Sequence, residues 1–363
     1  EVDYLNAGKS EVVNNVDWVA YKQHFFTSVL LTNTPFKKVD LKSDNLVDDE
    51  KVDTVFTKNF TAKMPLEFKN GALNYDMNMY YGPTDYKTLS AYDKNLDELV
   101  SLGWGVFGWI NQFVFIPLFG LLSGFMPYGI AIIIFTILIK IAMSPITYKS
   151  FLSQAKMKVL KPEIAELGEK FKNNPMKKQQ ETMALYSKAG VNPMAGCIPA
   201  LIQLPFMYAS FQFFPSAFEL RQKSFLWADD LSSFDEVIKL PFHIPLYGDH
   251  ISLFTLTAVI TSVFISVYNM SMTPTQDNPA LKYMPYIFPV MLLGIFNSLP
   301  SALTWYYTVS NVITLVLQFV IQNYIIDHRK ILSQIQENKK KPREKSKWQD
   351  SIYTSNKCRR LQI

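Results

Sequence analysis

The chain has 363 residues, of which 48% are hydrophobic, 14% are aromatic and only 18% are charged, and its formal net charge at pH 7 is +5. This balance argues against a single soluble globule and favours a membrane protein with sizeable soluble parts. The two cysteines, Cys197 and Cys358, stand in unrelated sequence contexts and therefore indicate no disulfide framework.

Residues 1–100 contain no segment that could span a bilayer, and they alternate between apolar and polar residues with a period of two. Between residues 60 and 81 the alternation changes phase at Asn70-Gly71, the preferred pair for a two-residue type I′ turn. We therefore expect a hairpin in which residues 64–68 pair with residues 73–77 and both apolar sets share one face. The region is predicted to be a β-rich soluble domain, a fragment of a sandwich, and it shows no catalytic motif.

A polar connector from Asp85 to Leu99, predicted to be helical, precedes an abrupt change of composition. Residues 104–125 carry no charge and begin with Trp104 and Trp109. The aromatic start and the nearness of the next apolar segment favour an amphipathic helix that lies in the membrane interface. A spanning helix is the alternative, and it would move the N-terminal region to the other side of the membrane.

Five further apolar stretches approach or reach the roughly 20 residues that are needed to cross a hydrocarbon core of about 30 Å. They cover approximately residues 127–146, 194–214, 251–269, 283–299 and 302–324. The sequence therefore predicts an α-helical membrane protein with a five-helix core.

The charges of the loops predict their sidedness, because loops rich in Lys and Arg stay in the cytoplasm. Residues 147–192 hold nine Lys against four Glu, and residues 327–363 hold eleven basic against four acidic residues. Residues 1–100 and 215–250 are acidic on balance. Five spans that start at residue 127 put both basic segments inside and both acidic segments outside, with the N-terminus out and the C-terminus in.

Lys140 lies within the first of these stretches, where a charge costs about 2.5–3.5 kcal/mol even on the insertion scale. Snorkelling towards the headgroups is the simple explanation. However, Lys149 is about 13 Å further along the helix, and the spans contain no acid to neutralise Lys140. Thr136 and Ser144 lie one turn before and one turn after Lys140 on the same face. This polar stripe favours a hydrated cavity.

Other spans carry polar stripes of their own. On residues 302–324 these are Tyr307, Asn311, Thr314, Gln318 and Gln322, on residues 194–214 Gln203 and Ser210, and on residues 251–269 Thr255, Ser262, Ser266 and Asn269. The simple explanation is hydrogen bonding between helices, worth about 0.6 kcal/mol per pair. Several stripes that converge with an unpaired lysine favour a shared cavity instead.

The basic loop is predicted to form a helical hairpin of residues 149–172 and 177–189, broken at Asn173-Asn174-Pro175. Its lysines fit either a solvated face with lipid headgroup contacts or a docking arm at the cytoplasmic mouth of the cavity. There is no glycine-rich nucleotide loop, and the four His at 24, 243, 250 and 328 form no metal cluster, so we expect neither an enzyme nor a cofactor.

Three further stretches are distinctive: YKSFLSQAKMKVLKPE (148–163), VNPMAGCIPALIQLP (191–205) and LTWYYTVSN (303–311). They resemble the YidC/Oxa/Alb family of membrane protein insertases, and the similarity runs in family order from about 104 to 330. The resemblance implies an insertase core at 127–330 with a cytoplasmic hairpin at 149–189. Residues 1–100 would then be the end of a periplasmic domain, whose larger part and preceding transmembrane helix are absent from this sequence.

The family also implies a groove, open to cytoplasm and lipid, that holds one positive charge, usually an arginine. Lys140 matches that position, which keeps the charge but loses bidentate carboxylate binding. By the same resemblance Thr136, Gln203, Tyr306 and Tyr307 fall at groove or substrate-contact positions, beside Ser144 and Asn311 of the polar stripes. The implied function is to take nascent hydrophobic segments from the cytoplasm into the bilayer of the bacterial inner membrane.

The resemblance further implies nascent membrane proteins, membrane lipids and the ribosome as partners. The hairpin and the basic tail, which matches the family at 327–348 within residues 331–363, would engage the ribosome, and the Sec translocon is a further partner of a chain acting as a monomer. Two other functions stay open on the sequence. A secondary transporter would also keep an intramembrane lysine, although its halves should be repeats and no repeat is visible. A structural scaffold would need no cavity.

Overall fold

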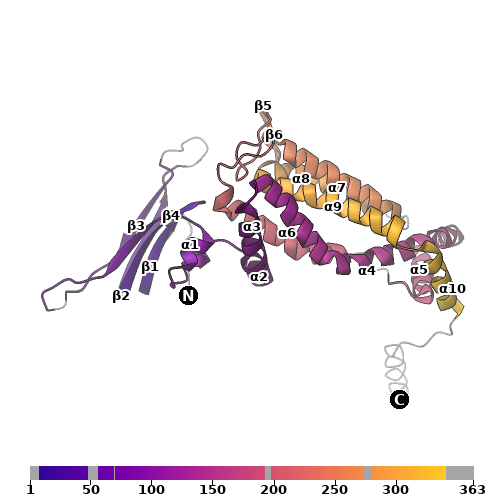
Figure 1. Ribbon diagram of the computed structural model, residues 1–363, viewed down its shortest axis with the longest axis horizontal. Coiled ribbons are helices and arrows are strands. Elements are labelled where there is room, and N and C mark those ends of the chain that lie inside the picture. Colours follow the sequence, from indigo (N-terminus) through magenta and orange to yellow (C-terminus); the bar gives the residue numbers. More distant parts are fainter. Residues whose placement is uncertain (1–7, 48–55, 69, 193–197, 273–278, 341–363) are drawn as a thin grey trace, which may run out of the picture. The chain divides into compact units, whose positions relative to one another are not determined.

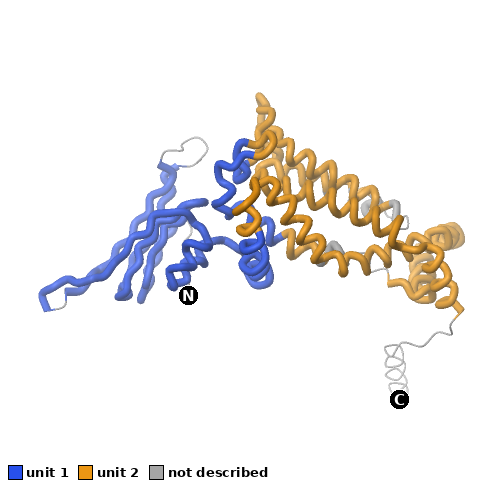
Figure 2. The backbone as a smooth tube through the Cα atoms, in the orientation of Figure 1, with its two compact units in different colours: residues 1–118, 208–224, 229–233 blue, residues 119–207, 225–228, 234–363 orange. Residues whose placement is uncertain are grey.

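The computed structural model describes residues 8–47, 56–68, 70–192, 198–272 and 279–340, so Cys197 and the predicted tail beyond Lys340 lie outside the described residues. The chain divides into two compact units, shown in Figure 2. Unit 1 comprises residues 1–118, 208–224 and 229–233, and unit 2 comprises residues 119–207, 225–228 and 234–363.

Unit 1 is built on a four-stranded antiparallel sheet of β1 (Ser10–Lys22), β2 (Phe26–Asn45), β3 (Lys58–Lys63) and β4 (Met77–Pro83), visible in Figure 1. The 20-residue β2 pairs with β1 along one edge. Its other edge pairs with β4 near its start and with β3 near its end. A β-rich N-terminal domain is thus confirmed.

The predicted hairpin of residues 64–68 with 73–77 is wrong. Asn70 and Gly71 do form a turn with positive φ values of 52° and 77°, but β3 ends at Lys63 and β4 begins at Met77. Both strands pair with β2 instead of with each other. Pro65 lacks an N–H for a ladder, and the long β2 offers each strand a separate length of unpaired backbone.

The connector contains two short helical segments, α1 (Tyr86–Ser90) and η1 (Leu96–Leu99), that cover one face of the sheet. Asp85 caps α1 by accepting a hydrogen bond from the Thr88 N–H at 2.9 Å. The apolar core beneath them consists of Val29, Leu31, Leu89, Leu96, Leu99, Val100 and Leu102. Alternation along the strands and helical spacing in the connector thus meet in one small core.

Residues 106–123 form a continuous helical segment of α2 (Val106–Ile110), the π-helical turn η2 (Asn111–Phe115) and α3 (Ile116–Ser123). Asn111 is buried, and its amide donates to the carbonyls of Leu102 (2.7 Å) and Ala209 (3.0 Å). The segment is long and apolar enough to cross a membrane. Length and composition therefore fit both placements, and the interfacial position stays a prediction.

Unit 2 contains a helix at each of the five predicted spans. These helices are α4 (Tyr128–Lys170), α6 (Ile198–Ser216, which continues into unit 1 from Tyr208), α7 (Leu253–Met272), α8 (Pro279–Asn297) and α9 (Ser301–Val320). Among the described residues the segments that meet a spanning length and hydropathy are Val106–Ser123, Tyr128–Lys170, Leu253–Met270 and Ser301–Ile325. A helical membrane protein is thus confirmed, while the number of five spans stays a prediction.

The bundle is held by α9, which packs against α4 and α7, while α8 packs against α7. Each helix keeps an exposed apolar side, for example at Leu138, Phe264, Met291 and Val316. Such faces suit contact with lipid chains rather than with water.

The hairpin differs from its prediction at one end. Instead of ending near residue 146, α4 continues as a single helix of 43 residues, about 64 Å long, through Pro145 and Pro162 to Lys170. The break at Asn173-Asn174-Pro175 is confirmed: α5 (Pro175–Ala189) starts with proline, and Asn174 caps it by accepting from the Lys177 N–H at 3.0 Å. A single proline removes one hydrogen bond, which a packed helix tolerates.

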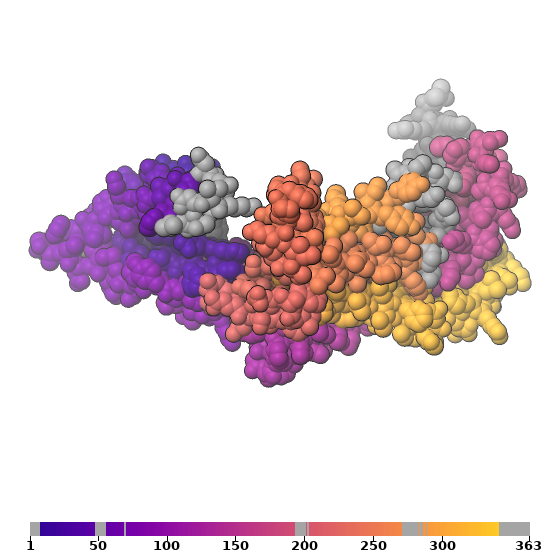
Figure 3. All heavy atoms as spheres, turned by 90° about the horizontal axis from the view of Figure 1, so that it is seen from above, coloured from indigo at the N-terminus to yellow at the C-terminus, as the bar shows by residue number. Residues whose placement is uncertain are grey.

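A last helix, α10 (His328–Lys340), lies beside α4 and α5, as Figures 1 and 3 show. Ile331 and Ile335 are buried in a cluster with Leu160, Ile164 and Tyr186. Lys339 adds an ion pair with Glu163 at 2.6 Å. The C-terminal end of α4, the whole of α5 and α10 therefore form one lobe, called here the hairpin lobe.

Candidate functional site

Lys140 lies near the middle of the apolar half of α4, and its side chain is buried, with 9% of the residue exposed. Its ammonium donates a hydrogen bond to Oε1 of Gln203 on α6 at 3.1 Å. Two of the predicted site residues thus meet, although 63 positions separate them. An amide oxygen is a neutral acceptor, so it satisfies one of the three ammonium protons without cancelling the charge.

The two neighbours of Lys140 on the predicted stripe are placed differently. Thr136 is fully buried, and its hydroxyl donates to the carbonyl of Ile132 one turn earlier, at 2.6 Å. Ser144 is half-buried, and its carbonyl accepts from the hydroxyl of Thr147 at 3.1 Å. Of the two neighbours, Ser144 is therefore more accessible to solvent than Thr136.

The two tyrosines of α9 point to different partners. Tyr306 is buried, with its ring centroid 6.3 Å from that of Phe135 on α4. Tyr307 lies with its ring 5.1 Å from Phe296 of α8, and its hydroxyl donates to the Met207 carbonyl at 3.4 Å. Because Met207 follows Gln203 by one turn of α6, Lys140 and Tyr307 approach the same side of α6 from α4 and α9.

Asn311 does not belong to this group. Its amide donates to the Ala258 carbonyl at 3.2 Å, to the Thr261 hydroxyl at 3.1 Å and to the Ser262 hydroxyl at 2.8 Å, all on α7. The polar stripe of α9 therefore turns from α6 to α7 within one helical turn. The sequence predicted that the polar stripes converge with Lys140, but these three hydrogen bonds join the Asn311 side chain to α7 and not to α4 or α6.

Other polar residues of α9, on both sides of Asn311, hold helices together. Gln318 is buried and donates to Oε1 of Gln154 on α4 at 3.1 Å and to Oδ1 of Asn269 on α7 at 2.8 Å. Thr257 and Thr308 share a hydrogen bond of 3.0 Å between α7 and α9. For this part of the stripe, the simple explanation of hydrogen bonding between helices is sufficient.

An aromatic cluster lies at the end of the bundle at which α7 and α9 begin. Trp305 lies with its ring 5.5 Å from Phe225 and 5.4 Å from Phe254, and Phe254 lies 4.4 Å from Trp227. The Trp305 indole donates to the carbonyl of Gly129 at 3.1 Å, and a Cβ at 129 would collide with the Phe225 ring. The sequence gives no signal of this cluster, because its members lie in distant segments.

Asp235 fixes the same end. Its carboxylate accepts from the backbone N–H groups of Leu253 (2.8 Å) and Phe254 (3.0 Å) and from the Trp227 indole (2.8 Å). It thus satisfies the unpaired donors at the start of α7, where the helix dipole also favours a negative charge. Charge counting found the acidic loop but not this capping role.

Among the residues that the structure describes, no group of three or more His, Cys, Asp or Glu could hold a metal ion. The side chain that contacts the Lys140 ammonium is the neutral, partly buried Gln203 amide, and the Tyr307 hydroxyl bonds to α6 one turn further along, at Met207. This arrangement provides one deeply placed positive charge beside neutral hydrogen-bonding groups, and it could bind a carboxylate.

Two family descriptions together match nearly all of the chain. Residues 119–329 match the 60Kd inner membrane protein family, and residues 1–117 match the YidC periplasmic domain. The chain is similar to proteins named membrane protein insertase YidC: it is 41% identical to that of Parabacteroides distasonis and 42% identical to that of Bacteroides fragilis. These alignments cover 95% and 96% of this chain but 57% and 58% of the relatives.

A solved structure titled "Active YidC insertase crystal structure with the first transmembrane domain resolved" is also similar, at 20% identity and a TM-score of 0.46. That similarity covers 87% of this chain and 66% of the solved one. The chain spans somewhat more than half the length of the curated relatives that it matches.

Proposed function

The chain belongs to the 60Kd inner membrane protein family, and on that premise we propose that it is the core of a membrane protein insertase. It receives apolar segments of nascent proteins from the cytoplasm and releases them into the lipid bilayer. The protein is a multi-pass inner-membrane protein whose N-terminal β-rich domain is periplasmic. The basic hairpin lobe lies in the cytoplasm, as the loop charges favour.

The observation that carries this proposal is the pairing of Lys140 with a neutral partner. A buried ammonium loses its hydration, and one amide oxygen does not replace an anion. A client segment with an acidic translocated part offers the missing carboxylate. We propose that Lys140, Gln203 and Tyr307 line a hydrated groove that lowers the cost of moving such polar groups below the bilayer surface.

The apolar part of a client takes a different route. The exposed faces of the bundle, which include Phe264 on α7 and Val316 on α9, are as apolar as lipid chains. A client helix that leaves the groove therefore moves along these faces into the bilayer without a barrier from polar groups. The driving force is partitioning of the apolar segment together with the membrane potential and the translating ribosome, with no chemical reaction.

The hairpin lobe is the proposed contact with the ribosome. Among the described residues of α4 beyond residue 148, α5 and α10, lysines such as Lys149, Lys172 and Lys188 are exposed. Exposed lysines on a helical lobe fit the phosphate backbone of ribosomal RNA. The Sec translocon remains a proposed partner, and the bundle is proposed to act as a monomer. The transporter alternative gains no support, because the relatives are insertases.

Photo-crosslinking tests the groove. A photoreactive amino acid at 203 or 307 should capture a ribosome-bound nascent chain that carries an apolar segment and an acidic translocated part. The same residue at 311 is the matched control, because Asn311 is held by α7. Capture at 311 equal to that at 203 and 307, or at none of the three, would contradict the proposed groove.

A further inference from the structure

The loop before α7 carries a short hairpin with an unusual surface. Its strands are β5 (Ile238–Ile244) and β6 (Gly248–Ile251), and residues 237–251 are called here the apolar finger. Its exposed large hydrophobic residues are Val237, Ile238, Phe242, Ile244 and Leu246. Water-facing hairpins seldom expose so many apolar side chains together, and such a patch marks an interaction surface.

Leu246 stands at the tip of the apolar finger and is 95% exposed. Its φ of +69° lies in the left-handed region, where Gly or Asn is the usual residue. A leucine that is both strained and exposed gains nothing from water. Its side chain is therefore expected to have an apolar environment that the protein itself does not provide.

The position of the tip is fixed by Gly294 on α8. A Cβ at 294 would collide with the carbonyl oxygen of Leu246, so only glycine lets the tip rest against the helix. Gly294 precedes the end of α8 at Asn297 by three residues, or about 4.5 Å of helix rise. The tip thus lies beside the last turn of α8 and not beyond the end of the helix.

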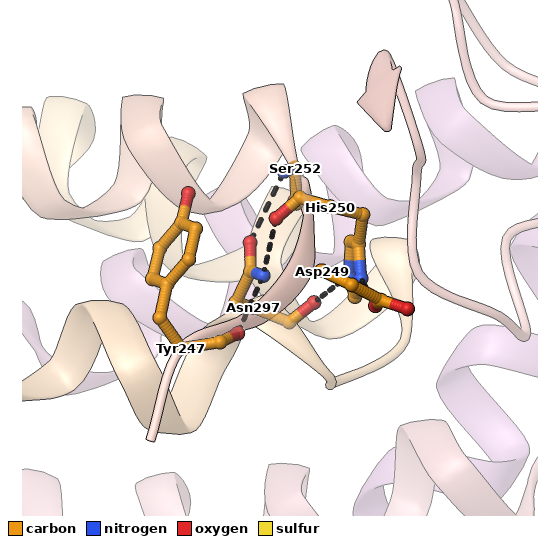
Figure 4. Close-up of polar contacts among 5 residues, drawn as sticks. All are labelled: Tyr247, Asp249, His250, Ser252 and Asn297. Atoms are coloured by element: carbon orange, nitrogen blue, oxygen red, sulfur yellow. Dashed lines mark hydrogen bonds and ion pairs between the residues drawn. The ribbon is translucent and has the colours of Figure 1, made fainter. Parts of the chain in front are cut away.

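The base of the apolar finger is held by the buried side chain of Asn297, shown in Figure 4. Its amide donates to the carbonyls of Tyr247 (2.9 Å) and His250 (2.8 Å), and its oxygen accepts from the Ser252 N–H at 3.1 Å. His250 returns a 2.8 Å hydrogen bond with the carbonyl of Asn297. The bonds to Tyr247 and His250 tie the finger to the end of α8, and the bond from Ser252 ties the residue that follows it, so its tip has a defined place.

The face of α8 around Gly294 is open and apolar. Val290 and Met291 lie one turn before Gly294 on the same side, Ile295 follows it, and all three are exposed. With 19 residues, α8 is about 28 Å long, close to the roughly 30 Å thickness of a hydrocarbon core. Residues one turn from its end therefore lie at the edge of the lipid chains, and the Leu246 carbonyl lies against this turn.

We propose that the apolar finger is a membrane anchor, which inserts Leu246, with Phe242 and Ile244 behind it, into the lipid leaflet beside the end of α8. The occupant of its apolar surface is lipid, because the tip continues the lipid-facing side of α8. The inference requires only that α8 spans the membrane, and it does not depend on insertase activity.

Spin-label depth measurement tests the anchor directly. In the full chain with Cys197 and Cys358 replaced by Ser, a nitroxide is attached to Leu246→Cys in vesicles of phosphatidylethanolamine and phosphatidylglycerol. Collision rates with oxygen, which concentrates in lipid, and with a water-soluble nickel complex are compared. Met291→Cys is the lipid control and Ser298→Cys, exposed in the turn after α8, is the water control. The oxygen-to-nickel ratio at 246 should match that at 291 and exceed that at 298.

A ratio at 246 equal to that at 298 would overturn the proposal, since the tip would then lie in water. Low collision rates with both reagents would also overturn it, since the tip would then be covered by protein. The Asn297→Ala variant adds a second test: loss of the bonds to Tyr247 and His250 should lower the oxygen-to-nickel ratio at 246 and leave that at 291 unchanged. An unchanged ratio at 246 would show that Asn297 does not hold the finger in the membrane.

Discussion

At the scale of single residues, part of the candidate site could be predicted from the sequence. A charge in an apolar window singles out Lys140 without any structure, and the family resemblance pointed to Gln203. Periodicity identified Asn311 as polar and inward-facing, but it cannot tell which neighbouring helix the side chain meets. The structure shows that Gln203 contacts Lys140 whereas Asn311 contacts α7. The face of a helix is a local property, and its partner is set by packing.

The charge at 140 is expected to matter more than the identity of the residue. Lys140→Arg should retain function, because it keeps a cation that also binds carboxylates. Lys140→Ala and Lys140→Glu should impair insertion of clients with acidic translocated tails, by about tenfold or more if the charged contact is worth about 1.5–3 kcal/mol. The measurement is insertion in cells depleted of the native insertase. Equal activity of all three variants would remove the charge from the mechanism.

At the scale of elements, the sequence predicted the break at Asn173-Asn174-Pro175 because cap and proline are local signals. It did not predict that α4 runs unbroken through Pro145, because a proline inside a helical pattern usually indicates a boundary. It also gave no sign that α10 packs on α4 and α5. That contact joins segments about 170 residues apart through two isoleucines, which only the folded lobe brings together.

Apolar packing, rather than the ion pair, should hold α10 in the hairpin lobe. Ile335→Ala should weaken its docking by about 2–5 kcal/mol, the range for removing a buried aliphatic side chain. Lys339→Ala should cost no more than about 1 kcal/mol, because the pair with Glu163 is partly exposed. Hydrogen exchange of residues 328–340 measures the difference, and Leu332→Ala, exposed on the same helix, is the control. A larger effect of Lys339→Ala would reverse this ranking.

At the scale of the whole molecule, the sequence predicted a β-rich unit followed by a helical membrane unit, because composition changes sharply near residue 104. It misplaced the pairing of β3 and β4, since a turn signal at Asn70-Gly71 does not reveal that the long β2 competes for both strands. The sequence also could not predict that residues 225–228 pack against the bundle. This packing depends on contacts of Phe225 with Trp305 and Gly129, which lie far away in the sequence.

The number of spans decides on which side of the membrane the N-terminal β-rich domain lies. If residues 106–123 lie in the interface, five spans put this domain and the hairpin lobe on opposite sides of the membrane. Asn59→Cys should then react with an impermeant thiol reagent only from the periplasm, and Lys172→Cys only from the cytoplasm; both positions are exposed. Reaction of both from the same side would mean that residues 106–123 form a sixth span.

The central claim, a groove at Lys140 that is open to water from the cytoplasm, is tested most directly by thiol accessibility. Cysteine replaces Lys140, Ser144 or Leu138, one at a time, in a chain whose Cys197 and Cys358 are Ser. An impermeant maleimide is added to inside-out or to right-side-out vesicles. Cysteines at 140 and 144 should react in inside-out vesicles only, because the proposed groove opens to the cytoplasm. A cysteine at 138, on the exposed apolar side of α4, should resist in both. Equal reaction at all three positions, or protection of both 140 and 144, would contradict the groove.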